Sequence, residues 1–156
     1  MNRNLARFVH LANALVGVTG LVYAWMRYAM EPSDPYSVVA HPLQPLVQHL
    51  HLWTAPLLVF AIGLIWQQHV WKHWRQGVKG GRRSGLTLML AAAPMIASGY
   101  FIQTAVAPAW RDIWIAVHLA ASALWVVFSI GHALASKNGA HRPHQRPGRS
   151  APEPAD

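Results

Sequence analysis

Four long apolar runs constrain the fold of this chain more than any other feature of its sequence. They cover residues Val9–Met30, Leu46–Gln68, Leu86–Val106 and Asp112–Ala133. Each run approaches the roughly 20 residues that a helix needs to cross about 30 Å of hydrocarbon. Charged residues make up only 12% of the sequence, about half of their share in an ordinary soluble domain. We therefore expect an all-α integral membrane protein, a bundle of four transmembrane helices.

The basic residues are distributed unequally between the two sides of these spans. Eleven lie before span one, between spans two and three, or after span four, whereas only Arg27 and Arg111 lie on the opposite side. Because an excess of Lys and Arg marks the cytoplasmic side, both termini are expected in the cytoplasm. The expected localisation is multi-pass in a bacterial inner membrane. The net charge of +8 then reflects orientation and contact with the lipid bilayer, and no nucleic-acid partner is expected.

Composition also divides the chain into two parts. Residues 1–137 carry the spans and their connections, whereas residues 138–156 form a basic, polar and Pro-rich tail that is expected to be disordered. The sequence contains no cysteine. Disulfides, thiolate metal sites and covalent haem attachment are therefore excluded.

Two histidines in span four point to the function. His118 and His132 lie fourteen residues apart, so at about 100° per residue their side chains point within roughly 40° of each other. At 1.5 Å per residue they are separated by about 21 Å along the helix axis. An ionisable side chain inside a membrane span is costly and indicates a functional site. The spacing suits two haems stacked in one bundle, one near each membrane surface.

The other spans offer partners for these histidines at matching depths. Spans two and four both run from outside to inside, so His51 and His118 lie at similar depths below the outer surface. Span one runs the other way, which places His10 near the inner surface at the level of His132. A six-coordinate haem needs two imidazoles on opposite faces of its macrocycle. The sequence therefore predicts two non-covalent haems b with iron bound by an outer pair, from spans two and four, and an inner pair, from spans one and four.

Two of these assignments have rivals. His49 and His51 are two residues apart, so they point about 160° away from each other and cannot both face one haem. The greater depth of His51 favours it over His49. His69 competes with His10 for the inner haem, although it lies at the inner rim of span two.

Other residues could assist these cofactors. His69 with Gln67 and Gln68 is a candidate quinone site at the inner rim. Arg27 and Arg111 on the outer side could neutralise haem propionates. No catalytic residue is assigned, because the few acidic residues lie in loops or the tail.

One stretch also resembles a known family. Arg7-Phe8-Val9-His10 followed by Thr19-Gly20 resembles the start of the b-type cytochrome subunits of membrane formate dehydrogenases and nickel–iron hydrogenases. The likeness covers all four spans, and it implies that two haems b are bound by one histidine in span one, one in span two and two in span four spaced by fourteen. His10, His118 and His132 match that layout, as does His49 or His51. The family's offset between spans one and two suits His49 best.

These observations predict an electron-transfer subunit rather than a stand-alone enzyme. We expect a dihaem cytochrome b that moves electrons across the bilayer, between the quinone pool and a partner redox subunit of an oxidoreductase complex. The alternative is a haem-free membrane anchor or assembly subunit of a respiratory complex, in which the histidines form hydrogen bonds between helices.

Overall fold

The computed structural model describes residues 3–32, 34–66, 71, 75 and 82–140, with the backbone alone for residues 82–84 and 136–140. Long helices account for most of this part of the chain. They are α1 (Arg3–Tyr28), α2 (Gln44–Ile65), α4 (Arg82–Thr104) and α5 (Pro108–Ala140). Each contains a stretch that is long and apolar enough to cross a membrane. The prediction of an all-α protein with four spans is confirmed.

Prolines mark the starts of two of these helices. Pro108 occupies the first position of α5, and the Ala107 carbonyl before it accepts a hydrogen bond from the Arg111 N–H at 3.0 Å. Pro45 lies in the first turn of α2. A helix's first turn does not use the N–H that proline lacks. Proline is therefore tolerated at the start of both helices, directly after the outer connections.

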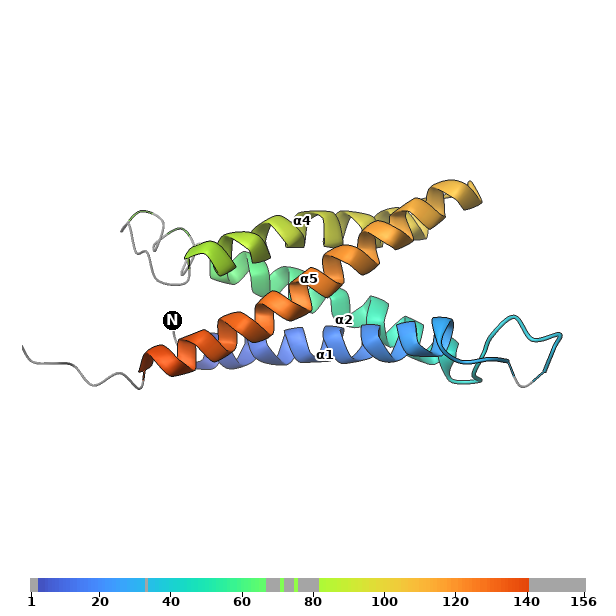
Figure 1. Cartoon of the computed structure of the whole chain (residues 1–156), viewed down its shortest axis with the longest axis horizontal. Helices are drawn as coiled ribbons and strands as arrows, with labels where there is room; N and C mark the ends of the chain where they lie inside the picture. Colours follow the sequence, from blue (N-terminus) through green and yellow to red (C-terminus); the bar gives the residue numbers. More distant parts are fainter. Residues whose placement is uncertain (1–2, 33, 67–70, 72–74, 76–81, 141–156) are drawn as a thin grey trace, which may run out of the picture.

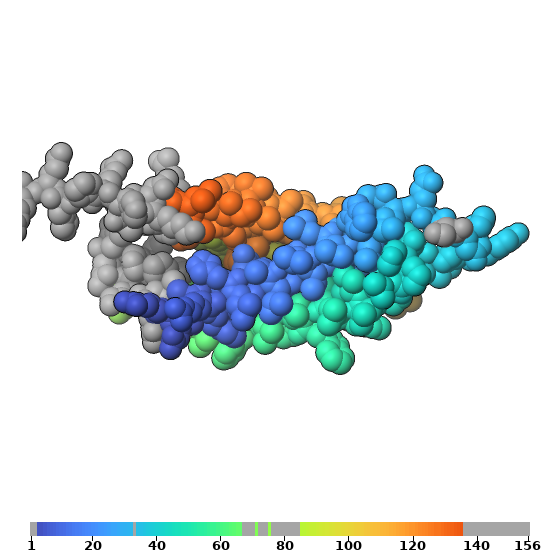
Figure 2. Space-filling view, turned by 90° about the horizontal axis from the view of Figure 1, so that it is seen from below, coloured from blue at the N-terminus to red at the C-terminus, as the bar shows by residue number. Residues whose placement is uncertain are grey.

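The helices form two antiparallel hairpins. Helix α1 packs along α2, and α4 packs along α5; Figure 2 shows α1 and α2 side by side along the molecule. The start of α1 and the end of α5 lie at one end of the bundle (Figure 1). The loop of residues 29–32 and 34–43 lies at the other end, together with the turn between α4 and α5. We call this the outer end, after the charge distribution.

A small apolar core joins the two hairpins. It consists of Leu58 from α2, Ala92 and Met95 from α4, and Ala121 and Trp125 from α5. Alanine at two of these positions lets the helices approach closely, as is common between membrane helices.

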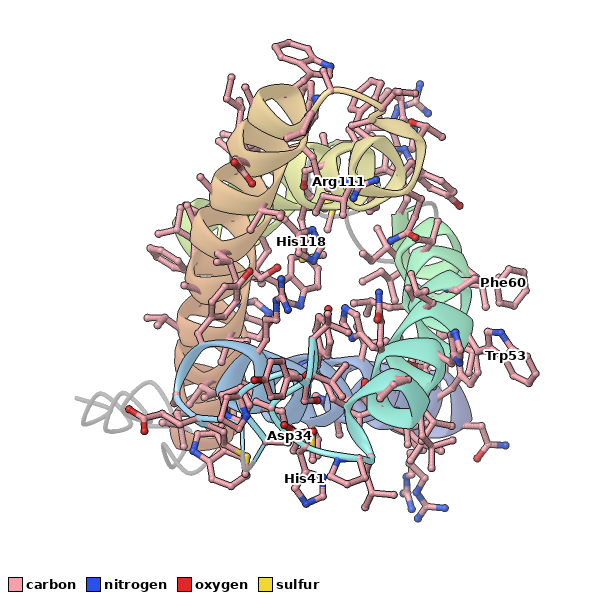
Figure 3. All side chains as sticks on the ribbon, turned by 90° about the vertical axis from the view of Figure 1, so that its right-hand side faces the viewer. Asp34, His41, Trp53, Phe60, Arg111 and His118 are labelled. Carbon is pink, nitrogen blue, oxygen red and sulfur yellow. The ribbon has the colours of Figure 1, made fainter. Side chains whose placement is uncertain are left out.

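Large apolar side chains also cover the outside of the bundle. Trp53 and Phe60 point away from α2 (Figure 3) and are 78% and 61% exposed. Exposed apolar surface of this kind suits contact with lipid chains, which cover it in a membrane.

Helix α1 extends beyond its predicted span at its start and α5 at both ends, whereas α1 ends at Tyr28 and α4 at Thr104, each two residues before the predicted end of the span. Helix α1 begins at Arg3 rather than Val9, and α5 continues to Ala140, so the first three residues of the predicted tail are helical. Hydropathy marks only the part of a helix inside hydrocarbon, whereas backbone hydrogen bonding continues into the polar region. The rest of the tail lies outside the described residues.

Orientation in the membrane can be tested by cysteine labelling, because the chain has no cysteine of its own. Ser37 lies in the outer loop, and Ser84 lies at the start of α4 at the opposite end. In intact cells, an impermeant thiol reagent should label the Ser37→Cys variant and leave Ser84→Cys unlabelled. The reverse pattern would place both termini outside.

Candidate functional site

Two histidines from different hairpins meet inside the bundle. The rings of His51 in α2 and His118 in α5 have centroids 6.3 Å apart, with their planes at 77°. Both residues are half-buried, and Figure 3 shows His118 pointing into the space between the helices. Counted from the start of its helix at 1.5 Å per residue, His51 lies about 10 Å below the outer end and His118 about 15 Å below it. The structure thus brings together the outer pair that the sequence predicts from depth.

Helix α4 fixes the orientation of the His118 ring. Its Nδ1 lies 3.0 Å from the Met95 carbonyl oxygen and 3.1 Å from Ser98 Oγ. A carbonyl can only accept, so Nδ1 carries the proton and donates it. In this neutral tautomer Nε2 holds a free lone pair, which is the form in which histidine binds a metal.

Helix α1 holds the His51 ring in a similar way. Its Nδ1 lies 3.3 Å from Thr19 Oγ1. The single hydroxyl proton of Thr19 is donated to the Leu15 carbonyl at 2.7 Å, so the hydroxyl oxygen accepts from the His51 Nδ1–H. The Val16 carbonyl also interacts with this ring. The His51 Nε2 is therefore also available to a metal.

A glycine lies beside each ring, but only the one beside His51 is required there. A Cβ atom on Gly20 would lie 2.8 Å from Cε1 of His51, closer than side-chain atoms pack. A Cβ atom on Gly99 would lie 3.5 Å from Cε1 of His118, an ordinary contact. The His51 ring consequently lies directly against the α1 backbone, where only glycine fits without a shift of the ring.

The two hairpins support their histidines with the same short motif. Thr19-Gly20 in α1 and Ser98-Gly99 in α4 each place a hydroxyl beside the Nδ1 of the histidine on the following helix. Of these two pairs, only Thr19-Gly20 was noted in the sequence, as part of the family resemblance. The repeated hydroxyl–glycine pair was the signal that could have indicated both supports.

The separation of the rings fits one metal between them. A metal–imidazole bond is about 2.0 Å long and a ring nitrogen lies roughly 1.1 Å from the ring centre, so two imidazoles on opposite sides of one metal have centroids about 6.2 Å apart. The observed separation is 6.3 Å. Rotation about a metal–nitrogen bond does not change the ligation, so the angle of 77° between the rings is compatible with it.

The number of protein ligands also suits haem better than a bare ion. Within the described part of the chain, no three His, Cys, Asp or Glu side chains gather to hold a metal. Two imidazoles alone are too few for an ordinary protein metal site. They are the number that a haem takes when its macrocycle supplies the other four ligands.

The remaining predicted ligands differ in their exposure. His49 is exposed, as is His10, whereas His132 is half-buried. Trp125 Nε1 in α5 donates to Asn13 Oδ1 in α1 at 2.6 Å and ties these antiparallel helices together. His10 lies three residues from Asn13 and His132 seven from Trp125, both toward the inner end, so their heights differ by about 6 Å. The inner pair remains a prediction that this geometry permits.

The predicted propionate partners lie at the outer end. Arg27 is in the last turn of α1 and is exposed. Arg111 is also exposed, and its Nη2 donates to the Ala105 carbonyl at 3.1 Å. Gln67, Gln68 and His69, the residues of the predicted quinone site and of the alternative inner ligand, lie outside the described residues.

Comparison with known proteins finds no protein family, no curated protein and no solved structure that matches this chain. The functional assignment therefore depends on the residues and the geometry described above.

Proposed function

We propose that this protein is a membrane cytochrome b that holds a haem between His51 and His118. The observation that carries the proposal is the pairing of these rings across the two hairpins at 6.3 Å, the separation expected for two imidazoles on one metal. The Nδ1 atoms of both rings are engaged by the neighbouring helix. That engagement orients both ligands and leaves the two Nε2 atoms for the iron.

The chain's own contribution is to hold two neutral imidazoles at fixed positions inside an apolar bundle. Haem, when bound, supplies one-electron transfer. His51 and His118 would hold the haem, and with both imidazoles on its iron it would suit electron transfer rather than substrate binding. The arginines at the outer end offer charges to carboxylates there.

We further propose a second haem b near the inner surface, between His10 and His132. The fourteen-residue spacing of His118 and His132 on α5 supports it, as does the resemblance to the cytochrome subunits of formate dehydrogenases and hydrogenases. Two haems about 21 Å apart along one helix would carry electrons from one membrane surface toward the other. In this proposal the electrons pass between the quinone pool and a partner redox subunit.

The visible spectrum of the purified protein tests the proposal. After reduction with dithionite it should show the sharp bands of low-spin haem b with two histidine ligands.

The alternative function is a haem-free membrane anchor. The contacts of Thr19 with His51 and of Ser98 with His118 favour it in part, because they also hold helices together. Those contacts act within each hairpin, however, and they do not account for the meeting of two imidazoles across the hairpins.

The second haem has its own test. His132→Ala should lower the haem content from two to one per chain, because the inner iron keeps only one protein ligand. His10→Ala should give the same result, measured as haem per chain in purified protein. If His10→Ala kept both haems while His132→Ala lost one, the inner partner of His132 would be a different residue.

A further inference from the structure

We infer that Thr19 is a positioning residue that controls the ligand strength of His51 and, through it, the reduction potential of the outer haem. The corresponding hydroxyl of Ser98 has a much smaller effect on His118. This inference rests on the proposed function, since it concerns the haem between these two histidines.

The difference starts from the acceptor that each Nδ1–H uses. His118 donates directly to the Met95 carbonyl at 3.0 Å. Ser98 lies beside this bond, and its hydroxyl also donates to the Met95 carbonyl, at 3.0 Å. Removing the Ser98 hydroxyl would leave the carbonyl in place, and a backbone carbonyl is not lost by any substitution. The His118 Nδ1–H therefore keeps its acceptor.

The hydrogen bond that helix α1 gives His51 is to a side chain, with the Val16 carbonyl as a further contact of the ring. The His51 Nδ1–H donates to Thr19 Oγ1 at 3.3 Å, and the Thr19 hydroxyl passes its own proton to the Leu15 carbonyl at 2.7 Å. The second bond polarises the hydroxyl oxygen and makes it a better acceptor. Replacing Thr19 by valine keeps the branched shape of the side chain but removes this oxygen. The His51 Nδ1–H would then lose its hydrogen bond to Thr19 and keep only the contact with the Val16 carbonyl.

A hydrogen-bond acceptor on Nδ1 makes the imidazole a stronger electron donor to the metal. A stronger donor stabilises ferric over ferrous iron and lowers the reduction potential, because hydrogen bonds around the ligands tune the potential of the haem. Loss of the Thr19 hydroxyl should thus raise the potential of the outer haem. Loss of the Ser98 hydroxyl should change it much less.

The experiment is a redox titration of the full-length protein in detergent, monitored by the visible absorption spectrum of the haem. The variants are Thr19→Val, Ser98→Ala and Thr19→Ser, and the transition to follow is the one that His118→Ala removes. Thr19→Val should shift this midpoint potential upward and Ser98→Ala should shift it less, while both keep the low-spin spectrum. Thr19→Ser, which restores the hydroxyl, should return the potential toward the wild-type value.

Two further outcomes are informative. Loss of the outer haem in Thr19→Val alone, with retention in Thr19→Ser, would also support a positioning role for the hydroxyl. Equal shifts in Thr19→Val and Ser98→Ala, a larger shift in Ser98→Ala, or no shift in either would overturn the inference and leave the proposed function intact. A wild-type protein without haem would instead contradict the proposed function.

Discussion

Replacing His118 by alanine is expected to remove the outer haem from the purified protein, and His51→Ala is expected to do the same. Each change leaves the outer iron with one protein ligand, in a site where the other imidazole lies on the opposite hairpin. The haem content should fall by one per chain in both variants. The midpoint reduction potential of the remaining haem should stay near its wild-type value. Haem per chain and a redox titration measure these two effects.

His49→Ala is the matched control for His51→Ala. His49 lies two residues away on the same helix, points about 160° from His51, and is exposed. The control variant should keep both haems. If His49→Ala lost the outer haem while His51→Ala kept it, the span-two ligand would be His49, as the offset in the resembling family suggests, and the pairing described here would be wrong.

The second large effect on haem binding is expected from Gly20→Ala, which adds a single methyl group beside His51. In Gly20→Ala the new Cβ would lie 2.8 Å from Cε1 of His51, so the ring must move away from α1. A metal–imidazole bond of about 2.0 Å leaves little room for such a shift. We expect the outer haem to be lost, or its spectrum to become high-spin because His51 no longer reaches the iron.

Gly99→Ala provides the matched control on the other hairpin. Its Cβ would lie 3.5 Å from Cε1 of His118, an ordinary contact, so the low-spin spectrum should be kept. Alanine also stabilises a helix interior by about 1 kcal/mol relative to glycine, so a weaker helix would not explain a loss of haem in Gly20→Ala. Retention of a normal outer haem in both variants would show that His51 does not lie against α1 as described.

The spans were predictable because hydropathy alone sets them. A helix in hydrocarbon must satisfy its own backbone and present apolar side chains, so runs of about 20 apolar residues have one structural interpretation. The meeting of His51 and His118 followed from direction and depth, since spans two and four run the same way. Depth, however, gave His51 only a narrow preference over His49. That choice depends on how α2 is rotated, which the packing of α2 on α1 determines.

The supports of the two histidines were not predicted, and their spacing explains why. Thr19 and His51 are 32 residues apart, whereas Ser98 and His118 are 20 residues apart. The two hairpins have connections of different length, so equivalent positions do not recur at one period along the sequence. Only the packed helices show that both hydroxyl–glycine pairs stand beside an imidazole. The pairing of His10 with His132 depends on packing in the same way, and it remains a prediction.

The most direct test of the account is the number of haems b per chain. It is measured as pyridine haemochrome on protein purified from cells supplied with ample haem, with protein concentration from amino-acid analysis. The account predicts two haems b per chain, and one in the His51→Ala and His118→Ala variants. A haem content near zero in the wild-type protein would contradict it and would favour the haem-free anchor.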